Sequence, residues 1–337
     1  MRRRIAIDGR GKANVVGTEP LEPVTIEAAR AAADRIRPLA VRTPLVPLQV
    51  DQAPAEIYLK LENLQPIGAF KIRGAGNAML GRPRASLADG VYTASSGNMA
   101  QAVAWVARRM GVAATVVVPE GTAETKLEGV RRLGAEIVSV PFADWWRVIL
   151  EHRHPGLDGA FIHPVADPAV MAGNATIGLE ILADLPDVDC VAVPYGGGGL
   201  SAGIASVIQA IRPAARVLAC ETEVAAPAAA AFAAGHPVEV DYGASFVTGI
   251  GSGSVVPEMW PLIQDLLAGS VTVSLEQIAA TIRLLVARHR IIAEGAGAAP
   301  VAAALTGKAG GGKVVAVVSG GNLDVRHLTT ILAGGVP

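Results

Sequence analysis

The chain has 337 residues, of which 51% are hydrophobic, 18% charged and only 4% aromatic. This length can bury the core of two domains or of one large α/β unit, built mainly from Ala, Val, Leu and Ile. The net charge of −1 and the sequence pI near 6.6 provide no clustered basic face for nucleic acid or an anionic membrane, which favours a small-molecule partner.

The apolar pattern predicts short strands that alternate with helices from residue 56 onward, after a helix at 26–36 and an extended arm. The clearest strands, rich in Val or Ile, are 57–61, 91–94, 114–118, 136–140, 190–194, 216–219 and 314–318. Helices are predicted at 101–110, 123–133, 174–182, 200–211 and 275–289, with Gly134 as a C-terminal cap. This alternation is typical of an α/β protein with parallel strands and helical crossovers.

The remaining composition points to an intracellular protein. Cys190 and Cys220 lie in apolar strand-like runs and are expected to be core residues. The basic residues 1–4 are not followed by the apolar segment of a signal peptide, and no uncharged apolar stretch reaches about 18 residues, so a cytoplasmic protein without a membrane span is expected. Segment 307–313 is similar to a P-loop, but Val314 replaces its Ser or Thr and a strand follows it, so we interpret it as a surface loop.

Three glycine-containing turns follow predicted strands, at the edge where ligands bind in open α/β sheets. The turn 95–101 offers backbone amides for a carboxylate, although an ordinary turn capped by Ser explains it equally well. The turn 195–200 contains four consecutive glycines before a helix, which suits an anion such as a phosphate. The turn 319–322, Ser-Gly-Gly-Asn, is by itself not specific evidence for a ligand site.

The sequence contains six lysines, so a candidate for a Schiff-base lysine can be sought by elimination. Lys71 has aromatic and aliphatic neighbours, and burial there would lower its pKa toward that of a reactive amine, although most lysines are solvated. Lys60 alternates with polar neighbours along a strand and is assigned to a solvated or paired face. Solvated positions are expected for Lys126, Lys308 and Lys313.

Residues 59–75, Leu-Lys-Leu-Glu-Asn-Leu-Gln-Pro-Ile-Gly-Ala-Phe-Lys-Ile-Arg-Gly-Ala, closely resemble the cofactor-lysine motif of fold-type-II pyridoxal-phosphate enzymes, in the branch of serine/threonine dehydratases and serine racemases. The resemblance runs from about residue 26 to 328. It implies an α/β fold of two open, twisted, mostly parallel sheets covered by helices, similar to tryptophan synthase β. It also implies a homodimer, with a large cofactor-binding domain, 1–87 plus 166–337, and a small domain, 88–165, that closes over the substrate.

The same resemblance assigns residues to pyridoxal 5′-phosphate. Lys71 forms the Schiff base, and Phe70 packs beside the ring. Asn98 hydrogen-bonds the ring hydroxyl, Ser319 faces the pyridine nitrogen, and Glu294 lies near the ring, with helix capping as its alternative role. The phosphate is expected on the backbone amides of Gly196, Gly197, Gly198, Gly199 and Leu200. The substrate carboxylate is expected on the turn formed by Ser95, Ser96, Gly97, Asn98 and Met99.

The implied reaction is loss of water and ammonia from a small β-hydroxy amino acid such as L-serine or L-threonine. Lys71, displaced by the substrate amine, removes the Cα proton, the β-hydroxyl leaves, and the resulting enamine hydrolyses to a 2-oxo acid and ammonia. Ser96 resembles the second acid/base of serine racemases, so an amino-acid racemase is the alternative. Arg147 and Ser252 match racemase substrate contacts, although Arg147 can equally be a solvated helix residue. Hydroxyaspartate or a bulkier β-hydroxy amino acid are alternative substrates.

Some positions depart from the family pattern. Met99 replaces a common His, and Thr248 replaces a common Asp. Glu221 is followed six residues later by Pro227 rather than by the Asp of the racemase-type metal site, and the histidines lack metal-ligand spacing on a predicted helix, so no metal is expected.

Three other classes are disfavoured by the same residues. An inactive binding protein on this scaffold is disfavoured by the retained Lys71. A dinucleotide oxidoreductase lacks the Gly-x-Gly-x-x-Gly spacing, and 249–253 is out of register with the nucleophile elbow of a serine hydrolase. The sequence shows no regulatory domain after the third glycine turn, so feedback control by such a domain is not expected.

Overall fold

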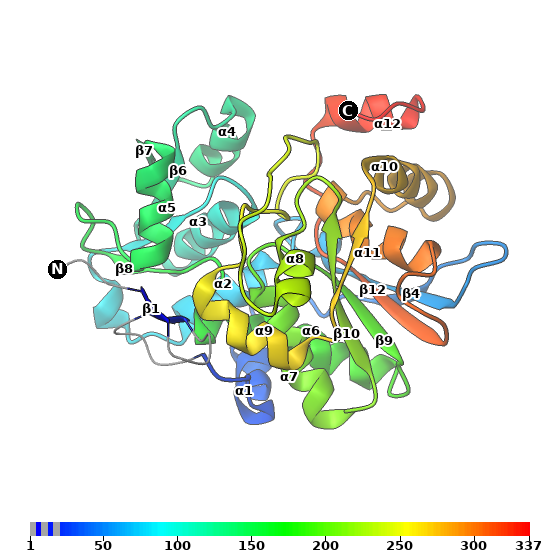
Figure 1. The fold of residues 1–337 in the computed structure, drawn as a ribbon. Coiled ribbons are helices and arrows are strands. Elements are labelled where there is room, and N and C mark those ends of the chain that lie inside the picture. The colour runs from blue at the N-terminus through cyan, green and yellow to red at the C-terminus, as the bar shows by residue number, and fades with distance from the viewer. Residues whose placement is uncertain (1–4, 8–12, 16–20) are drawn as a thin grey trace.

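The computed structural model describes residues 5–7, 13–15 and 21–337, which form two main sheets covered by helices (Figure 1). The strands are β1 (Ile5–Ile7), β2 (Ala13–Val15), β3 (Leu45–Pro47), β4 (Glu56–Leu61), β5 (Val91–Ala94), β6 (Ala114–Pro119), β7 (Glu136–Val140), β8 (Ala160–Phe161), β9 (Cys190–Pro194), β10 (Arg216–Thr222), β11 (Ser270–Val273) and β12 (Lys313–Val318). The α-helices are α1 (Ile26–Ile36), α2 (Lys71–Leu80), α3 (Asn98–Met110), α4 (Glu124–Arg132), α5 (Phe142–Glu151), α6 (Pro168–Asp184), α7 (Gly199–Ile211), α8 (Pro227–Ala234), α9 (Trp260–Leu266), α10 (Leu275–Leu284), α11 (Gly295–Leu305) and α12 (Val325–Leu332). Short helical turns are η1 (Glu62–Leu64), η2 (Arg84–Leu87), η3 (Pro257–Met259) and the π-helix η4 (Leu285–His289).

The larger sheet has six strands in the order β11-β10-β9-β12-β4-β3. β12 pairs in parallel with β9 and β4, and β3 is the antiparallel edge strand. β9 shows how this sheet is buried: Val191 and Val193 face one apolar cluster, while Cys190 and Ala192 face the other. Because helices cover both faces, these strands are continuous apolar runs rather than alternating ones.

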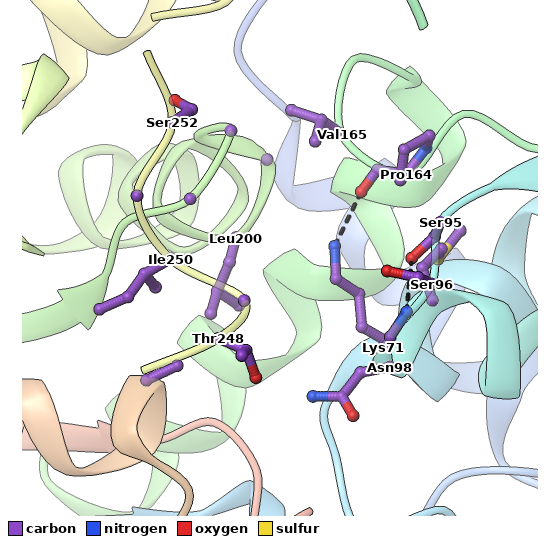
Figure 2. Close-up of a pocket in the computed structure, with 18 of the residues that line it drawn as sticks. Lys71, Ser95, Ser96, Asn98, Pro164, Val165, Leu200, Thr248, Ile250 and Ser252 are labelled. Carbon is purple, nitrogen blue, oxygen red and sulfur yellow. Dashed lines mark hydrogen bonds between the residues drawn. The ribbon is translucent and has the colours of Figure 1, made fainter. Parts of the chain in front are cut away.

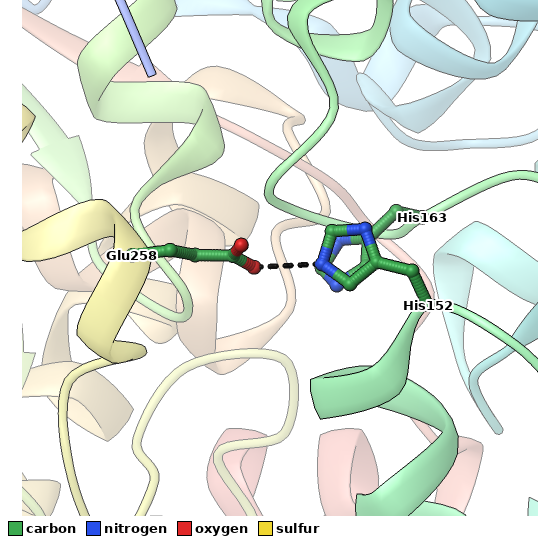
Figure 3. Close-up of side chains that lie close together, drawn as sticks. All are labelled: His152, His163 and Glu258. Atoms are coloured by element: carbon green, nitrogen blue, oxygen red, sulfur yellow. Dashed lines mark hydrogen bonds and ion pairs between the residues drawn. The ribbon is translucent and has the colours of Figure 1, made fainter. Parts of the chain in front are cut away.

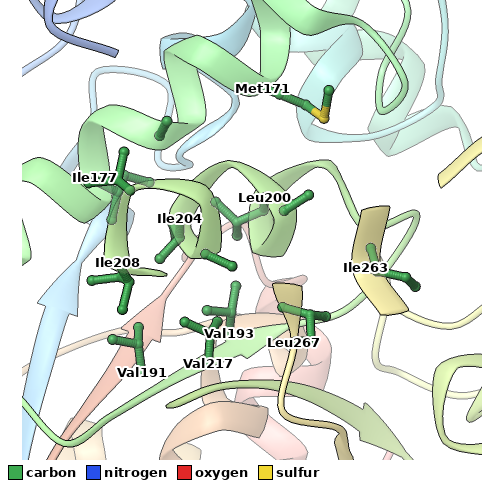
Figure 4. Close-up of a cluster of buried hydrophobic side chains, with 14 of the residues drawn as sticks. Met171, Ile177, Val191, Val193, Leu200, Ile204, Ile208, Val217, Ile263 and Leu267 are labelled. Atoms are coloured by element: carbon green, nitrogen blue, oxygen red, sulfur yellow. The ribbon is translucent and has the colours of Figure 1, made fainter. Parts of the chain in front are cut away.

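Helices α6 and α7 cover one face of the larger sheet. In Figure 4, Ile204 and Ile208 of α7 lie between Ile177 of α6 and the sheet residues Val191 and Val193. Helices α10 and α11 contribute to the cluster on the opposite face. Burial of each such side chain contributes about 1.5–3 kcal/mol to the free energy of unfolding. The two helix layers therefore fix the positions of β9 and β12, and with them the turns that follow these strands.

The smaller sheet has the order β7-β6-β5-β8, and its strands are parallel. Val116 and Val118 face a cluster that includes residues of α2 and α3, whereas Tyr92 and Val117 face α5. In Figure 1 this sheet and its helices lie to one side of the larger sheet. All four strands fall inside 88–165, the segment predicted to be the small domain, whose boundaries stay a prediction.

The α/β fold with two mostly parallel sheets is confirmed. Some elements, among them β11, α2, α5 and α11, were not among the predicted ones, and some predicted bounds differ. α6 begins at Pro168 rather than at 174, because Asp167 caps it and proline suits a first helical position. The predicted helix 275–289 is α-helical only to Leu284 and continues as a π-helix, after which Arg290 has φ 60°.

Other predictions about the chain's composition can be compared with the structure directly. Both cysteines are free and buried, and burial raises the pKa of Cys190 to about 11. Residues 307–312 of the segment 307–313 form a loop, as predicted, and Lys313 begins β12. Among the described residues, no helix combines the length and apolar character needed to cross a membrane.

Candidate active site

A cavity of about 420 Å³ lies at the carboxyl ends of the parallel strands of both sheets. The turns after β5, β9 and β12 line it, so the structure brings together the three turns that the sequence singled out. In Figure 2, Lys71 and Ser96 lie on one side of the cavity, and Leu200 and Ile250 lie on the other. This is the edge at which open α/β sheets bind ligands.

Lys71 is the first residue of α2, and its side chain points into the cavity (Figure 2). Its Nζ donates a hydrogen bond to the carbonyl oxygen of Pro164 at 2.8 Å and lies 5.1 Å from the centre of the Phe70 ring. Burial lowers the pKa of Lys71 from 10.5 to about 8. The backbone N–H of Phe70 donates to the carbonyl oxygen of Ser319 at 2.9 Å, which ties the lysine turn to the third glycine turn. Ser319 itself is buried and lines the cavity.

A buried ion network anchors the helix that carries Lys71. Arg73 donates to both carboxylate oxygens of Glu62, at 2.8 and 2.9 Å, and to Glu180 at 2.7 Å. Lys60 is fully buried and pairs with Glu180 at 2.5 Å, so the paired alternative for Lys60 is confirmed and the solvated one is wrong. Burial alone would raise the pKa of Glu62, but the adjacent guanidinium of Arg73 brings it below its ordinary value. Removing one partner would leave a buried charge uncompensated, so the network fixes the start of α2.

The four glycines after β9 form a backbone cradle at the N-terminus of α7. Gly198 has φ 99°, which favours glycine. A Cβ at Gly196 would lie 2.7 Å from the carbonyl oxygen of Gly249, and one at Gly197 would lie 2.5 Å from Cγ2 of Val165. Because no side chain fits there, the backbone amides at the helix N-terminus stay open to an anion, which fits the phosphate of the expected cofactor.

Asn98, Glu294 and Asn322 form a hydrogen-bonded chain across the cavity wall. Asn98 Nδ2 donates to Glu294 Oε1 at 2.8 Å, and Asn322 Nδ2 donates to Asn98 Oδ1 at 2.8 Å. Burial raises the pKa of Glu294 to about 7, against the opposing effect of the Asn98 hydrogen bond. Glu294 occupies the N-cap position of α11, but its side chain makes no capping bond to the described backbone. Its carboxyl group is therefore directed to the cavity residues rather than to the helix.

The turn after β5 carries the residues predicted to bind the substrate carboxylate, and all of them line the cavity. The backbone N–H of Gly97 donates to Ser95 Oγ at 3.2 Å. The Ser96 hydroxyl makes no hydrogen bond to another described residue, and Met99 is buried. Ser252 lines the cavity from the larger-sheet side, where its hydroxyl donates to the carbonyl oxygen of Ser254 at 2.8 Å. Their contacts with a substrate stay a prediction.

Two basic residues lie elsewhere than the sequence suggested. Arg147 is absent from the described residues that line the cavity. Its side chain is 61% exposed and pairs with Asp144 one helical turn earlier, so the solvated alternative describes it and we leave it out of the proposed substrate contacts. Lys126, expected to be solvated, lines the cavity. It lies in the first turn of α4, after the carboxyl end of β6, and that position was the signal available in the sequence.

Aromatic residues missed by the sequence reasoning also line the cavity. Trp145 and Trp146 of α5 contribute from the small-sheet side, together with Ile149, and Tyr242 contributes from the larger-sheet side. In α5, Asp144, Arg147 and Glu151 recur at helical spacing and mark a polar face, so the apolar face with the two tryptophans was the signal available in the sequence. Trp145, Trp146 and Ile149 give the small-sheet side of the cavity an apolar wall.

Glu221, at the position of the racemase-type metal site, has protein partners instead. Its carboxylate accepts hydrogen bonds from the backbone N–H groups of Ala228 and Ala229, both at 2.8 Å, and from Ser270 Oγ at 2.6 Å. Burial raises its pKa, whereas these donors act in the opposite direction. Pro227 starts α8, whose first amides supply two of the three donors. The residues present therefore satisfy the carboxylate without a cation and do not fit the racemase-type metal site.

Comparisons with known proteins extend over most of the chain. A family model described as pyridoxal-phosphate dependent enzyme matches residues 36–320. An L-threonine ammonia-lyase of Geobacter sulfurreducens is 41% identical over 311 residues, which cover 90% of this chain and 77% of that protein. Maize serine racemase has a TM-score of 0.82 and 30% identity, over 91% of this chain and 96% of that one. The processed threonine deaminase isoform 2 from Solanum lycopersicum has a TM-score of 0.81 and 32% identity, over 96% of this chain and 99% of that one.

Proposed function

Because the chain belongs to the family of pyridoxal-phosphate dependent enzymes, we propose that it removes water and ammonia from a small β-hydroxy amino acid such as L-threonine or L-serine. The products are ammonia and a 2-oxo acid, 2-oxobutanoate or pyruvate. One observation carries this proposal: the Lys71 amine, with a pKa of about 8, lines the same cavity as a glycine cradle for a phosphate and a turn for a carboxylate.

The turns after β9 and β12 of the larger sheet, together with Asn98 after β5 of the smaller sheet, would hold the cofactor. When bound, pyridoxal phosphate supplies an electron sink for the charge left on Cα. The amides of 196–200 would hold the phosphate, and Ser319 would offer a neutral hydroxyl to the ring nitrogen, which favours rapid elimination over a long-lived carbanion. Asn98 is oriented from both sides, by Glu294 and Asn322, so that its amide can bind the ring hydroxyl.

Lys71 is the base that takes the Cα proton at Nζ. A lysine with its ordinary pKa is almost entirely protonated near neutral pH, whereas a pKa of about 8 leaves about a tenth of the amine neutral at pH 7. The turn 95–99 binds the substrate carboxylate with backbone amides and Ser95. The apolar wall with Trp145 and Ile149 limits the water that reaches the reacting atoms.

Racemisation is the second candidate because of Ser96. Its hydroxyl lines the cavity without a hydrogen bond to another described residue, so it is available as a second acid/base. Inversion at Cα needs a proton donor on the face opposite to the base, whereas elimination needs none there: Lys71 takes the Cα proton, and the departing hydroxyl takes up a proton to leave as water. The two activities differ in product: a racemase yields the D-amino acid, and a dehydratase yields the 2-oxo acid.

The test combines a spectrum with a product assay. The purified enzyme is expected to show the visible absorbance band of the lysine-bound cofactor and to release 2-oxo acid from L-threonine or L-serine. Lys71→Ala should lose both. Lys308→Ala is the matched control, because Lys308 Nζ also donates to a backbone carbonyl, that of Thr272 at 2.6 Å, but at an exposed site. A D-amino acid without 2-oxo acid would instead establish the racemase, and a band that survives in Lys71→Ala would contradict the cofactor assignment.

Three further parts of the proposal concern the whole protein. We propose a cytoplasmic homodimer whose segment 88–165 closes over the substrate. Light scattering would check the dimer through a mass twice that of the 34.4 kDa chain, and cell fractionation would check the location. Small-angle scattering with and without L-serine would report closure as a smaller radius of gyration.

A further inference from the structure

His163 is a buried histidine next to the cavity, and the chemistry proposed above does not use it. It follows β8 and is 2% exposed. Its Nδ1 accepts hydrogen bonds from the backbone N–H groups of Val165 at 3.0 Å and Ala166 at 2.7 Å, and its Nε2 donates to the carbonyl oxygen of Ile149 at 3.2 Å. An Nδ1 that accepts from two amides carries no proton, so the imidazole is neutral with its hydrogen on Nε2. Burial and the neighbouring His152 lower the pKa of His163 to about 3, in agreement with this tautomer.

The turn that His163 closes makes two contacts with the active site. The carbonyl oxygen of Pro164 accepts the hydrogen bond from Lys71 Nζ at 2.8 Å. Val165 fills the space that side chains in the glycine cradle would need: a Cβ at Gly197 would lie 2.5 Å from Val165 Cγ2, and one at Gly199 would lie 2.6 Å from the Val165 carbonyl oxygen. One short segment therefore contacts both the catalytic amine and the phosphate cradle.

We propose that His163 is a positioning residue, whose neutral imidazole fixes this turn so that the Pro164 carbonyl holds the free amine of Lys71 in one place. The inference rests on the proposed function, which makes Lys71 the base. An amine that donates one N–H to a fixed carbonyl points its lone pair away from that carbonyl, so the Pro164 oxygen restricts the lone pair to the two remaining tetrahedral positions. Without the imidazole, two buried amides lose their acceptor, and the turn is free to relax.

The same histidine belongs to a cluster with the composition of a metal site. His152, His163 and Glu258 offer ligand atoms that all lie within 4.8 Å of one another (Figure 3). Both nitrogens of His163 are already engaged by the backbone, and a metal at Nε2 would require the proton to move to Nδ1, which would break two hydrogen bonds. His152 Nε2 instead lies 2.9 Å from Glu258 Oε1, and its ring centre lies 4.3 Å from that of His163. The pair His152–Glu258 thus packs against the imidazole and supports it.

Three variants of the full-length enzyme test the proposal. His163→Ala removes the acceptor. His163→Asn retains an oxygen that can accept from amides two and three residues ahead, as in an Asx turn. His154→Ala is the matched control, because His154 Nδ1 accepts from the backbone N–H of Gly156 at 3.1 Å in a similar but exposed turn. Circular dichroism and the thermal midpoint establish that each variant is folded.

Two measurements separate positioning from a purely structural role. With saturating cofactor, kcat of His163→Ala should fall about tenfold with KM nearly unchanged, kcat of His163→Asn should be largely restored, and His154→Ala should match the wild type. Independently of turnover, the rate at which the cofactor-free chain binds pyridoxal phosphate should rise with pH around the Lys71 pKa of about 8 in the wild type. In His163→Ala that midpoint should move to higher pH, because water reaches the amine.

Several outcomes would overturn the proposal. One is a folded His163→Ala that keeps the wild-type kcat and midpoint; if His163→Ala does not fold, a His163→Asn that loses as much kcat as Lys71→Ala serves instead. Another is stoichiometric Zn²⁺ binding to the holoenzyme, measured by calorimetry and lost in His163→Ala, which would make the cluster a metal site. A different result would separate this proposal from the proposed function. If the pH midpoint of cofactor binding shifts in His163→Ala while the wild type forms no 2-oxo acid from any β-hydroxy amino acid, the positioning role is supported and the proposed function is refuted.

Discussion

Replacing Glu294 by Gln is expected to stabilise the protein more strongly as the pH rises. Glu294 is 5% exposed, and burial raises its pKa from 4.5 to about 7. Since the folded-state pKa is the higher one, the contribution of this group to stability is present in full below about pH 4.5 and is lost as the pH rises through about 7. The loss amounts to about 1.4 kcal/mol at about pH 5.5 and about 3.4 kcal/mol at about pH 8.5. The free energy of unfolding of Glu294→Gln, relative to that of the wild type, should therefore increase by about 2 kcal/mol between these pH values.

Urea unfolding of the cofactor-free full-length chain measures this difference. Gln keeps an oxygen that accepts the hydrogen bond from Asn98, so the substitution removes the charge while it retains the contact. Glu22→Gln, at an exposed carboxylate, is the control and should show a difference from the wild type that does not change with pH. A Glu294→Gln advantage that is equally independent of pH would refute the reasoning, because it would mean that burial does not hold the proton on this carboxyl group.

Three other perturbations have expected outcomes. Arg73→Met should lower the free energy of unfolding in urea by about 3–5 kcal/mol, because it leaves buried carboxylates without their partner, whereas Arg37→Met at an exposed ion pair should cost less than about 1 kcal/mol. Gly197→Ala should weaken pyridoxal phosphate binding about tenfold in a fluorescence titration, because a Cβ there overpacks the cradle. Removal of divalent cations with EDTA should leave the thermal midpoint unchanged, because the Glu221 carboxylate has three protein donors.

Each of these expectations has an opposing result. Equal losses for Arg73→Met and Arg37→Met would mean that the buried network contributes no more than a surface pair. Wild-type affinity in Gly197→Ala would place the phosphate elsewhere. A midpoint that falls with EDTA and recovers with Mg²⁺ would show that a cation stabilises the chain.

The four inner strands of the larger sheet could be predicted closely from the sequence, whereas its edge strands β3 and β11 were not among the predicted strands. β9 has the predicted bounds 190–194, and β12 begins one residue before the predicted 314. Both are buried on two faces, so they are short, β-branched runs with glycine turns directly after them. The turns after β9 and β12 could therefore be expected at one edge of this sheet, and Lys71 could be singled out from its apolar neighbours in the sequence.

Contacts between distant segments could not be predicted in this way. Asn98 and Glu294 are hydrogen-bonded although 196 residues separate them, and their meeting depends on how the two sheets pack. The same holds for His163 and Glu258: His163 follows β8 of the smaller sheet, whereas Glu258 lies in η3, 95 residues later. It also holds for Lys126, which lines the cavity although its neighbours in the sequence are those of an ordinary helix residue. The exposed position of Arg147, in contrast, could be predicted from the sequence, because Asp144, Arg147 and Glu151 recur at helical spacing and share one polar face of α5.

The location of the cavity between two sheets separates two tasks in the chain. Most residues proposed to hold the cofactor, among them the glycine cradle and Ser319, follow strands of the larger sheet, while Asn98 follows β5 of the smaller one. The substrate turn and the wall with Trp145 come from elements of the smaller one. A change in α5 or at residues 95–97 can therefore alter which amino acid enters without loosening the cofactor, whereas Asn98 in the same turn is proposed to bind the cofactor ring. Substitutions in these segments can change substrate preference during evolution while the residues that bind the cofactor stay the same. Directed evolution of substrate preference should therefore concentrate on those two segments.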